Sequence, residues 1–450
     1  MAMTWSQLLS PQRFRAKNGE IIPTVTPSTQ EGIDALRTDF HIDYDRVVFS
    51  GAFRRLGRKT QVHPLAEHDL THNRLTHSVE VASVGRSLGN RVGVMLQAGG
   101  FLPENNTPGD IGAVVQVACL AHDLGNPPFG HTGEDALRHW FRKETNLRFL
   151  TSLSEAELSD VQTYEGNAHS LRIVANLEMY PDAGGMRLSA ASIGALIKYP
   201  WTSQGPRGRS KFNIYQTELP FIRRVAAELG LLEAGCDQWV RHPLSYLMEA
   251  SDDICYALLD LEDAVELELL TDTEVESVLS ELTFEESTWH AQSSRQRCAM
   301  LRGIAIGKAI EDAAQTFMKH QSDLLSGEFK GKDLISLCSP QVQNTLEKAK
   351  ELARTRIFRH RTKLMTEIAT FPCLGSILDL FVPAAHALLF ERKLDVRQSL
   401  ILDLLKNHNP ILETDSLYQA YMKILDFVGG MTDNAAAKMA QDLSGTGILR

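Results

Sequence analysis

The feature that most restricts the fold is an apolar run that leads directly into a histidine and an aspartate. Residues 114–121 read VVQVACLA, and His122 and Asp123 follow them at once. A run this apolar predicts a buried helix, which places the carboxylate of Asp123 at the edge of a core. A buried carboxylate without a partner costs on the order of several kcal/mol. The fold must therefore bring positive charge to this position, and a divalent cation supplies more of it than one Lys or Arg.

The remainder of the chain also predicts helices. Hydrophobic residues make up 43% of the sequence and aromatic residues only 7%, with Leu, Ala and Glu frequent, and this balance favours helices over sandwiches or barrels. Ile306, Ile310 and Phe317 share one helical face, while Ser339 followed by Pro340 is typical of a helix start. No alternating run of useful strand length stands out. We therefore predict an all-α fold.

Breaks between the helical segments are rich in Gly, Pro and Asn, and fall at residues 98–112, 180–187, 200–211 and 326–333. The chain has no internal repeat and no low-complexity linker, so one helical body is expected rather than separate modules. Helical patterning begins near residue 45 and continues to about 440. We expect an N-terminal arm, a core with the metal site and a C-terminal helical region packed on it, over residues 1–45, 46–270 and 271–450.

Composition also restricts where such a protein works. The apolar stretches are interrupted by charge, so no membrane span is expected, and the N-terminus lacks the order of a secretory signal. Six cysteines stand singly, without a CxxC pair, which is typical of reduced thiols. The formal net charge of −10 disfavours extensive nucleic-acid binding, although a local basic channel stays open. We predict a cytoplasmic protein.

Three distant segments carry the residues that we expect to hold the cation. His77 lies near the start of one predicted helix, His122 and Asp123 end a second, and Asp252 lies on a third. Alone, a His-Asp pair is more often a helix-end cap, and Asp252 beside Asp253 is more often part of a solvated face. The combination of two imidazoles and two carboxylates suits Mn²⁺, Mg²⁺, Co²⁺, Ni²⁺ or Fe²⁺ and leaves about two positions open if the ion is octahedral. Open positions are what catalysis at a metal requires.

The same segments resemble a known family. The order His77, His122-Asp123, Asp252 is similar to that of the HD superfamily of metal phosphohydrolases. The surrounding strings resemble those of bacterial deoxynucleoside triphosphate triphosphohydrolases, the dGTPase-like proteins, and more distantly the vertebrate dNTP hydrolase with a SAM domain. These strings are FRRLGRKTQV (53–62), NRLTHS (73–78), HDLGNPPFGHTGE (122–134), YEGNA (164–168), KFNIYQTE (211–218) and DDICYALLDLEDA (252–264).

The resemblance implies an HD-domain helical bundle extended by C-terminal helices. It implies hydrolysis of a dNTP, with dGTP as one candidate, to deoxynucleoside and inorganic triphosphate. In that reaction a metal-activated water attacks the α-phosphorus and the 5′-oxygen of the sugar leaves. Mn²⁺ or Mg²⁺ is the expected ion, with Co²⁺, Ni²⁺ or Fe²⁺ as further candidates. The resemblance also implies a homo-oligomer, a hexamer or a tetramer.

The resemblance further implies roles for individual residues. His131 and Glu134 match the catalytic pair that orients the water or passes a proton to the leaving group, although Glu134 could instead cap the next helix. The matched substrate contacts are Gln61 at the sugar 3′-hydroxyl, Arg74 and Lys211 at the phosphates, Tyr256 against the deoxyribose and Asp260 near the sugar or phosphates. Lys198 is a further candidate phosphate contact.

Basic residues cluster at Arg54, Arg55, Arg58 and Lys59, and again at Arg207, Arg209 and Lys211. Beyond Lys211 we expect these to serve subunit contacts or the solvated surface.

Two positions depart from the family pattern. His169 stands where many relatives carry Gln, and we interpret it as a neutral hydrogen-bonding replacement rather than a base or phosphate contact. Asn213 stands where Gly is usual, which leaves the shape of the loop at Lys211 open.

Two other functions stay open. One is a different HD phosphohydrolase, acting on nucleoside monophosphates or (p)ppGpp-like nucleotides. The other is a regulator that binds nucleotide or single-stranded DNA and keeps the pocket as a sensor.

Overall fold

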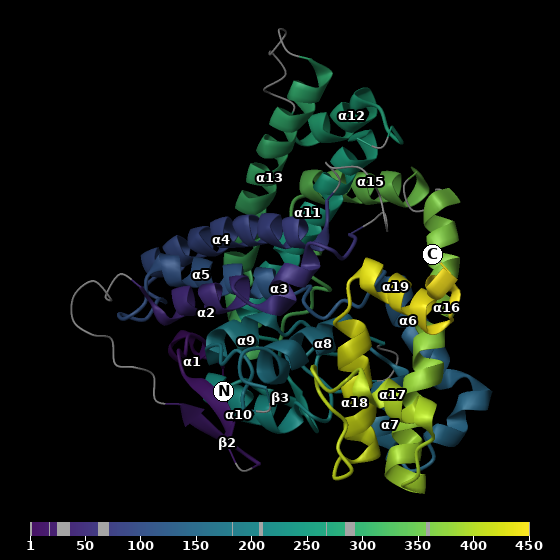
Figure 1. Ribbon diagram of the computed structural model, residues 1–450. Coiled ribbons are helices and arrows are strands. Elements are labelled where there is room, and N and C mark those ends of the chain that lie inside the picture. The colour runs from purple at the N-terminus through teal and green to yellow at the C-terminus, as the bar shows by residue number, and fades with distance from the viewer. Residues whose placement is uncertain are drawn as a thin grey trace.

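The apolar run forms helix α5 (Pro108–Ala121) in the computed structural model, where it lies beside α4 (Arg74–Ala98) and α2 (Asp39–Val48) (Figure 1). Thr107 begins it through a capping box, and every side chain from Ile111 to Ala121 except Gln116 is buried. Helices α2, α4, α9 and α11 pack around it. The predicted burial of this helix is therefore confirmed, and His122 follows its last turn at the edge of the core.

The structure describes residues 2–17, 19–24, 37–61, 72–181, 183–206, 210–266, 268–283, 293–356 and 361–449. Besides α5, its α-helices are α1 (Trp5–Leu8), α2 (Asp39–Val48), α3 (Gly51–Leu56), α4 (Arg74–Ala98), α6 (Gly130–Arg142), α7 (Glu155–Gln162), α8 (Gly166–Arg172), α9 (Ala190–Leu196), α10 (Leu219–Leu229), α11 (Pro243–Glu266), α12 (Asp272–Thr283), α13 (Ser294–Lys319), α14 (Gln321–Ser326), α15 (Pro340–Arg356), α16 (Arg361–His386), α17 (Val396–Asp403), α18 (Leu417–Gly429) and α19 (Asp433–Leu443). Short 3-10 or π turns lie at Glu144–Phe149, Ile173–Leu177, Ile335–Leu337, Ala387–Glu391 and Thr446–Leu449.

The fold is all-α apart from two small hairpins that the sequence patterns did not reveal. Strand β1 (Arg13–Lys17) pairs antiparallel with β2 (Glu20–Thr24), and β3 (Glu233–Gly235) pairs with β4 (Gln238–Trp239). These strands are too short to show a convincing alternation. The first helix of the main body, α2, begins before the expected residue 45.

The N-terminal segment is tied into the body of the protein. Trp5 and Leu8 are buried, and the buried guanidinium of Arg13 donates to the carboxylates of Asp39 and Asp43. Asp43 also accepts hydrogen bonds from the backbone and hydroxyl of Ser189. A buried ion pair in which both oxygens of Asp43 accept hydrogen bonds fixes this segment against α2.

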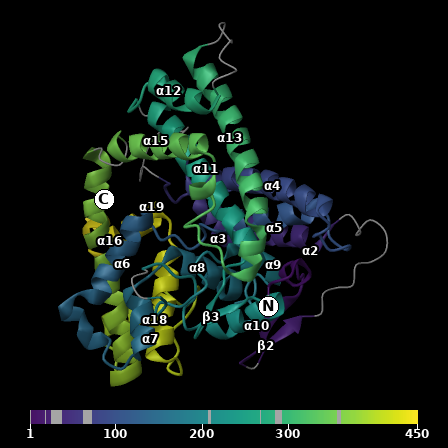
Figure 2. The ribbon, with the colours of Figure 1, turned by 180° about the vertical axis from the view of Figure 1, so that it is seen from behind.

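Two hydrophobic cores divide the helices. The first unites α1, α2, α4, α5 and α9–α15, whereas the second unites α6, α7 and α16–α19. Figures 1 and 2 both show α16, α18 and α19 gathered around α6 and α7, apart from α4 and α5. Residues 271–450, which we expected to form one C-terminal region, are thus divided between the two cores. Helices α12–α15 belong to the first core and α16–α19 to the second.

Helix α16 corrects one expectation from the sequence. Residues 363–391 are long and apolar enough to cross a membrane, whereas we expected no such stretch. The second core accounts for this composition, because Leu374, Ile377, Leu378 and Phe381 are fully buried in it. A central core helix passes the same test of length and composition as a membrane span.

Two positions on α16 test this assignment. Leu378 is fully buried and Ile368 is 70% exposed on the same helix. Leu378→Ala should lower the free energy of unfolding by about 2–5 kcal/mol, because it leaves a cavity in the second core. Ile368→Ala should stay within about 0.5 kcal/mol of the wild type. Urea denaturation measures both, and equal losses would show that α16 is not a core helix.

Candidate active site

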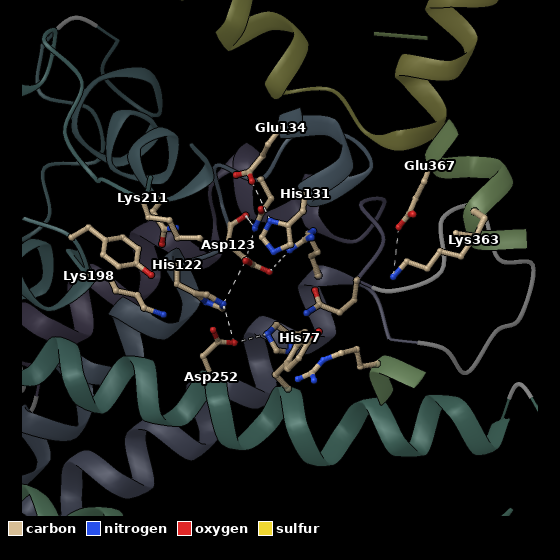
Figure 3. A pocket seen from close by; sticks show the side chains of 18 residues that line it. His77, His122, Asp123, His131, Glu134, Lys198, Lys211, Asp252, Lys363 and Glu367 are labelled. Carbon is tan, nitrogen blue, oxygen red and sulfur yellow. Dashed lines mark hydrogen bonds and ion pairs between the residues drawn. The ribbon is translucent and has the colours of Figure 1, made fainter. Parts of the chain in front are cut away.

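The candidate site is a cavity of about 640 Å³ between the two cores. Helices α4, α5 and α11 of the first core bring His77, His122 and Asp252 to it, and α6 of the second core brings His131 and Glu134. Figure 3 shows these side chains pointing into one space. Ligand pockets in proteins typically enclose about 300–1,000 Å³, so this cavity has room for a nucleotide.

Three of the four expected metal ligands form one group. His77, His122 and Asp252 each offer one ligand atom, and these atoms all lie within 4.8 Å of one another. Nε2 of His77 lies 3.1 Å from Oδ1 of Asp252, and Nε2 of His122 lies 3.6 Å from the same oxygen. Imidazole nitrogens and a carboxylate oxygen converging on one point fit a divalent cation.

Asp123 adjoins this group, but the protein already engages its oxygens. Oδ1 of Asp123 lies 3.5 Å from Nε2 of His122 and accepts a hydrogen bond from Asn126. Oδ2 pairs with the guanidinium of Arg74 at 2.7 Å. Oδ1 is therefore the oxygen through which Asp123 could join His77, His122 and Asp252 around an ion.

The electrostatics of this group favour a cation. Burial opposes a charged imidazole, yet the carboxylates of Asp123 and Asp252 raise the pKa of His122 to about 9. Burial likewise opposes the charge of Asp123, but Arg74, His122 and His77 lower its pKa to about 2. The pKa of Asp252 is also held well below its ordinary value by His122 and His77, against the effect of burial. Both carboxylates are thus ionised at neutral pH and draw in positive charge.

The side chains of His131 and Glu134 form a pair at the start of α6. Nδ1 of His131 lies 3.1 Å from Oε2 of Glu134, while the imidazole is 76% exposed and lies in the cavity. Glu134 is buried, and Oε1 accepts a hydrogen bond from the backbone of Gly166. Although burial raises the pKa of Glu134, the contact with His131 and the charge of Arg138 lower it overall. An ionised Glu134 accepts the Nδ1 proton of His131 and leaves Nε2 directed elsewhere.

Arg74 and Lys211 line the cavity, as does Lys198, whose ammonium pairs with Glu249 at 2.9 Å. Arg55 of the first basic cluster instead pairs with Glu178. Lys59 is buried behind the cavity. Arg207 and Arg209 of the second cluster lie outside the described residues.

Of the other predicted substrate contacts, Gln61 and Tyr256 line the cavity and Asp260 does not. Tyr256 stands one turn beyond Asp252 on α11 and Asp260 one turn further, where it is buried. Oε1 of Gln61 is buried without a hydrogen-bond partner within the described protein. A buried orphan acceptor in a cavity wall is a position where a ligand donor is favoured.

Seven lining residues were not predicted. Asn126 and Asn167 lie within the recognised motifs, and Tyr199 is next to Lys198, so neighbourhood alone could have suggested them. The others come from α15 and α16 and carry no sequence signal for this site: Arg354, Lys363, Leu364 and Glu367. Figure 3 places Lys363 and Glu367 on the side of the cavity opposite Lys198 and Lys211.

The two departures from the family pattern have different consequences. His169 is fully buried and does not line the cavity, and burial together with Arg172 holds its pKa well below the ordinary value. It is neutral, as expected, but neither ring nitrogen has a hydrogen-bond partner among the described residues, and Oδ1 of Asp426 lies 3.9 Å from Nε2. Asn213 bridges two lining segments, accepting from the backbone of Tyr199 and donating to the carbonyl of Asn167.

Comparisons with known proteins agree with this geometry. The family model of the HD domain matches residues 74–165, which include every site residue described above on α4, α5 and α6. Asp252 lies outside this match. The match identifies the helices around the site as an HD domain, a helical class whose members depend on metals.

Relatives are similar over nearly the whole chain. A deoxyguanosinetriphosphate triphosphohydrolase-like protein of Pseudomonas aeruginosa is 44% identical, covering 91% of this chain and 94% of its own. One of Synechocystis is 34% identical over 98% of this chain and 99% of its own. A deoxyguanosinetriphosphate triphosphohydrolase of Klebsiella pneumoniae is 30% identical over 90% of this chain and 94% of its own. The chain therefore belongs to the deoxyguanosinetriphosphate triphosphohydrolase-like family, a group of hydrolases, and the resemblance seen in the sequence is confirmed.

Metal binding and His131 can be separated by mutation. Asp123→Ala and Asp252→Ala should each weaken Mn²⁺ binding by more than the roughly 10- to 100-fold typical for losing a residue that only supports a ligand. His131→Ala should retain Mn²⁺ affinity, because its imidazole pairs with Glu134 and lies outside the group of three. Isothermal titration calorimetry with Mn²⁺ measures all three variants. Equal losses of affinity would mean that His131 is itself a ligand.

Proposed function

We propose that the protein hydrolyses deoxynucleoside triphosphates to deoxynucleoside and inorganic triphosphate, with a divalent cation at His77, His122, Asp123 and Asp252. The observation that carries this proposal is the sharing of one cavity by the metal-ligand group, the His131–Glu134 pair and several cations. The Klebsiella relative, which is named a deoxyguanosinetriphosphate triphosphohydrolase, supports it.

The charges of the cavity suit a triphosphate. Five Lys and Arg side chains line it against four carboxylates, a net of +1 with the imidazoles counted as neutral, the state in which they bind a metal: Arg74, Lys198, Lys211, Arg354 and Lys363 against Asp123, Glu134, Asp252 and Glu367. A bound divalent ion would raise this to +3. A triphosphate carries about four negative charges, so substrate and site would nearly neutralise one another.

A divalent cation at this site, Mn²⁺ or Mg²⁺ in our proposal, would polarise a phosphoryl oxygen and activate the attacking water. Arg74 is held beside the ligand group by Asp123, so its remaining N–H groups can bind a phosphate oxygen. Lys211 and Lys198 also line the cavity and would bind the other phosphates.

His131 would supply the proton for the leaving group. Its Nδ1–H donates to the ionised Glu134, which orients the ring and leaves Nε2 for the substrate. When water attacks the α-phosphorus, the bond to the 5′-oxygen breaks and that oxygen takes a proton from Nε2. An acid with a pKa near neutrality is suited to this step.

The sugar would lie between Gln61 and Tyr256. The orphan Oε1 of Gln61 can accept a hydrogen bond from the 3′-hydroxyl. Tyr256 would pack against C2′, where an added hydroxyl has no room, and this would disfavour ribonucleotides. Asp260, one turn behind, would act through Tyr256 rather than touch the substrate, which modifies the contact that the resemblance implies.

Product analysis tests the reaction. With Mn²⁺ and dGTP, ³¹P NMR should show inorganic triphosphate as the phosphorus product. In H₂¹⁸O the label should enter the triphosphate and not the nucleoside, because attack is at phosphorus. Orthophosphate or pyrophosphate as the sole inorganic product would favour the other HD phosphohydrolases. Steeply salt-dependent DNA binding without any turnover would favour a regulator.

The far wall of the cavity supports guanine as the preferred base. Glu367 and Lys363 lie near one another there, 3.9 Å apart, with Leu364 beside them. A carboxylate can accept from N1–H and the 2-amino group of guanine, while an ammonium can donate to O6 or N7. Adenine offers an acceptor at N1, so it cannot make the first contact.

Glu367→Gln should therefore reduce kcat/KM for dGTP by roughly 10- to 100-fold, the loss of a hydrogen bond to a charged group. The value for dATP should change less than about threefold. Glu391→Gln, an exposed site at the far end of the same helical segment, serves as the matched control. A panel of the four dNTPs and GTP provides the measurement, and equal losses for all bases would exclude base recognition by Glu367.

Two broader features belong to the same proposal. Six free cysteines support a reducing, cytoplasmic location. A homo-oligomer, hexamer or tetramer, is supported by the exposed side chains of Val396, Leu400 and Leu404 along α17 and at its end, since exposed apolar patches are typical of protein interfaces.

A further inference from the structure

Asp433, at the first turn of α19, is a buried carboxylate that the proposed reaction does not use. It is 2% exposed, and both of its oxygens accept hydrogen bonds from segments that are distant in sequence. Oδ1 accepts from the backbone N–H of Phe129 at 2.9 Å. Oδ2 accepts from the backbone N–H of Thr60 at 2.9 Å and from its hydroxyl at 2.6 Å.

Each of these partners is close to a site residue. Phe129 is two residues before His131, and Thr60 is next to Gln61. Thr60 also forms a β-bridge with Asn73, the residue that caps α4 just before Arg74. Asp433 therefore contacts the segment that carries His131 and the segment that carries Gln61, and both of these residues line the cavity.

The backbone at Phe129 is strained and needs support. Phe129 has φ of 63° and Gly130 has φ of 59°, in the left-handed region. A non-glycine residue there costs on the order of 1 kcal/mol or more and persists only where its surroundings hold it. At Gly130 a Cβ would lie 2.6 Å from Nη2 of Arg74, so a side chain there would displace the guanidinium that pairs with Asp123. The turn must keep this shape for α6 to begin with His131 facing the cavity.

Little else holds His131 in place. Its imidazole is 76% exposed and, among the described residues, forms a hydrogen bond only from Nδ1 to Glu134. The position of the ring thus depends on where the backbone turn places the start of α6. The hydrogen bond from Phe129 N–H to Asp433 holds that turn in place.

A second buried contact reinforces the same junction. The ammonium of Lys59 donates to the carbonyl of Asn126 and, at 2.7 Å, to that of Gly429 at the end of α18. The backbone N–H of Asp433 donates to the carbonyl of Arg58. The segment from Gly429 to Asp433 is therefore hydrogen-bonded both to residues 58–60 and to Phe129.

We propose that Asp433 is a positioning residue, which holds the Phe129–Gly130 turn and Thr60 so that His131 and Gln61 face the substrate. This inference rests on the proposed function for its kinetic consequences. It assigns the C-terminal helices a role in catalysis, although their sequence carries no motif that indicates one.

A double-mutant cycle with Asp433→Asn tests the proposal. The amide keeps the size of the side chain but replaces one acceptor by a donor that faces an N–H. In the wild-type background kcat should fall roughly 10- to 100-fold, as expected for a misplaced catalytic group. In the His131→Ala background, Asp433→Asn should change the residual kcat by less than about twofold, because the group that it positions is absent. Equal falls in both backgrounds would overturn the proposal, since a general structural defect acts on either.

Hydrogen exchange provides a readout that does not need activity. In Asp433→Asn the amides of Phe129 and Thr60 should exchange at least about tenfold faster, while amides inside α5 keep their rates. Asp442→Asn, an exposed carboxylate at the other end of α19, is the matched control and should leave exchange and kcat unchanged. Unchanged exchange at Phe129 and Thr60 would overturn the proposal even if the wild type proved inactive, whereas inactivity alone would count against the proposed reaction.

Thr60→Val covers the case in which Asp433→Asn does not fold. Valine keeps the shape of threonine and removes only the hydroxyl that donates to Asp433. KM for dGTP should rise about threefold or more, because Gln61 is adjacent, with a smaller change in kcat. An unchanged KM would contradict the link from Asp433 to Gln61.

Discussion

Asp123 lies where a buried apolar helix ends, and its two carboxylate oxygens are bonded by side chains from different parts of the chain. Arg74 comes from the first turn of α4 and Asn126 from the loop that follows α5. His122 lies beside the same carboxylate and also beside Asp252 of α11. Two carboxylates that flank one imidazole repel one another unless a cation stands between them. The packing of α4, α5 and α11 in the first core thus creates a demand for positive charge that a divalent ion would meet.

The site also depends on a contact between two cores. The metal-ligand group belongs to helices of the first core, whereas His131 and Glu134 belong to α6, whose apolar face packs with α16–α19. Catalysis between them requires their relative position to stay fixed to within a fraction of an ångström. Hydrophobic packing is tolerant of small shifts, but hydrogen bonds are directional. This is why the buried polar contacts of Lys59 and Asp433 matter at the junction, as the proposed Asp433→Asn experiment would show.

Local sequence patterns were enough to predict many of the residues that line the site. His122 and Asp123 were predictable because an apolar run led into ionisable groups, and His77 and Asp252 because the recognised motifs surround them. Glu367 and Lys363 were not, since a Lys–Glu pair four residues apart on a helix is usually part of a solvated face. Likewise, α16 was not recognised as a core helix, because its apolar residues pack against α6, α17, α18 and α19, which lie in other segments of the chain. Whether such a pair lines a site, or such a helix lies in a core, depends on contacts between distant segments. The spacing of residues within one segment does not reveal these contacts.

The distribution of charge gives the cavity a direction. Arg74, Lys198 and Lys211 stand near the metal-ligand group, while Lys363 and Glu367 stand across the cavity on α16. An anionic tail is favoured at the first end, and a base with both donors and acceptors is favoured at the second. An overall charge of −10 does not oppose this binding, because exposed charges beyond about 10 Å are largely screened at physiological salt. A nucleotide in the reverse orientation would bring its triphosphate against Glu367 and leave the carboxylates of Asp123 and Asp252 beside an uncharged base. In the proposed orientation, with the phosphates at the metal-ligand group, the anionic tail lies beside Arg74, Lys198 and Lys211 and away from Glu367.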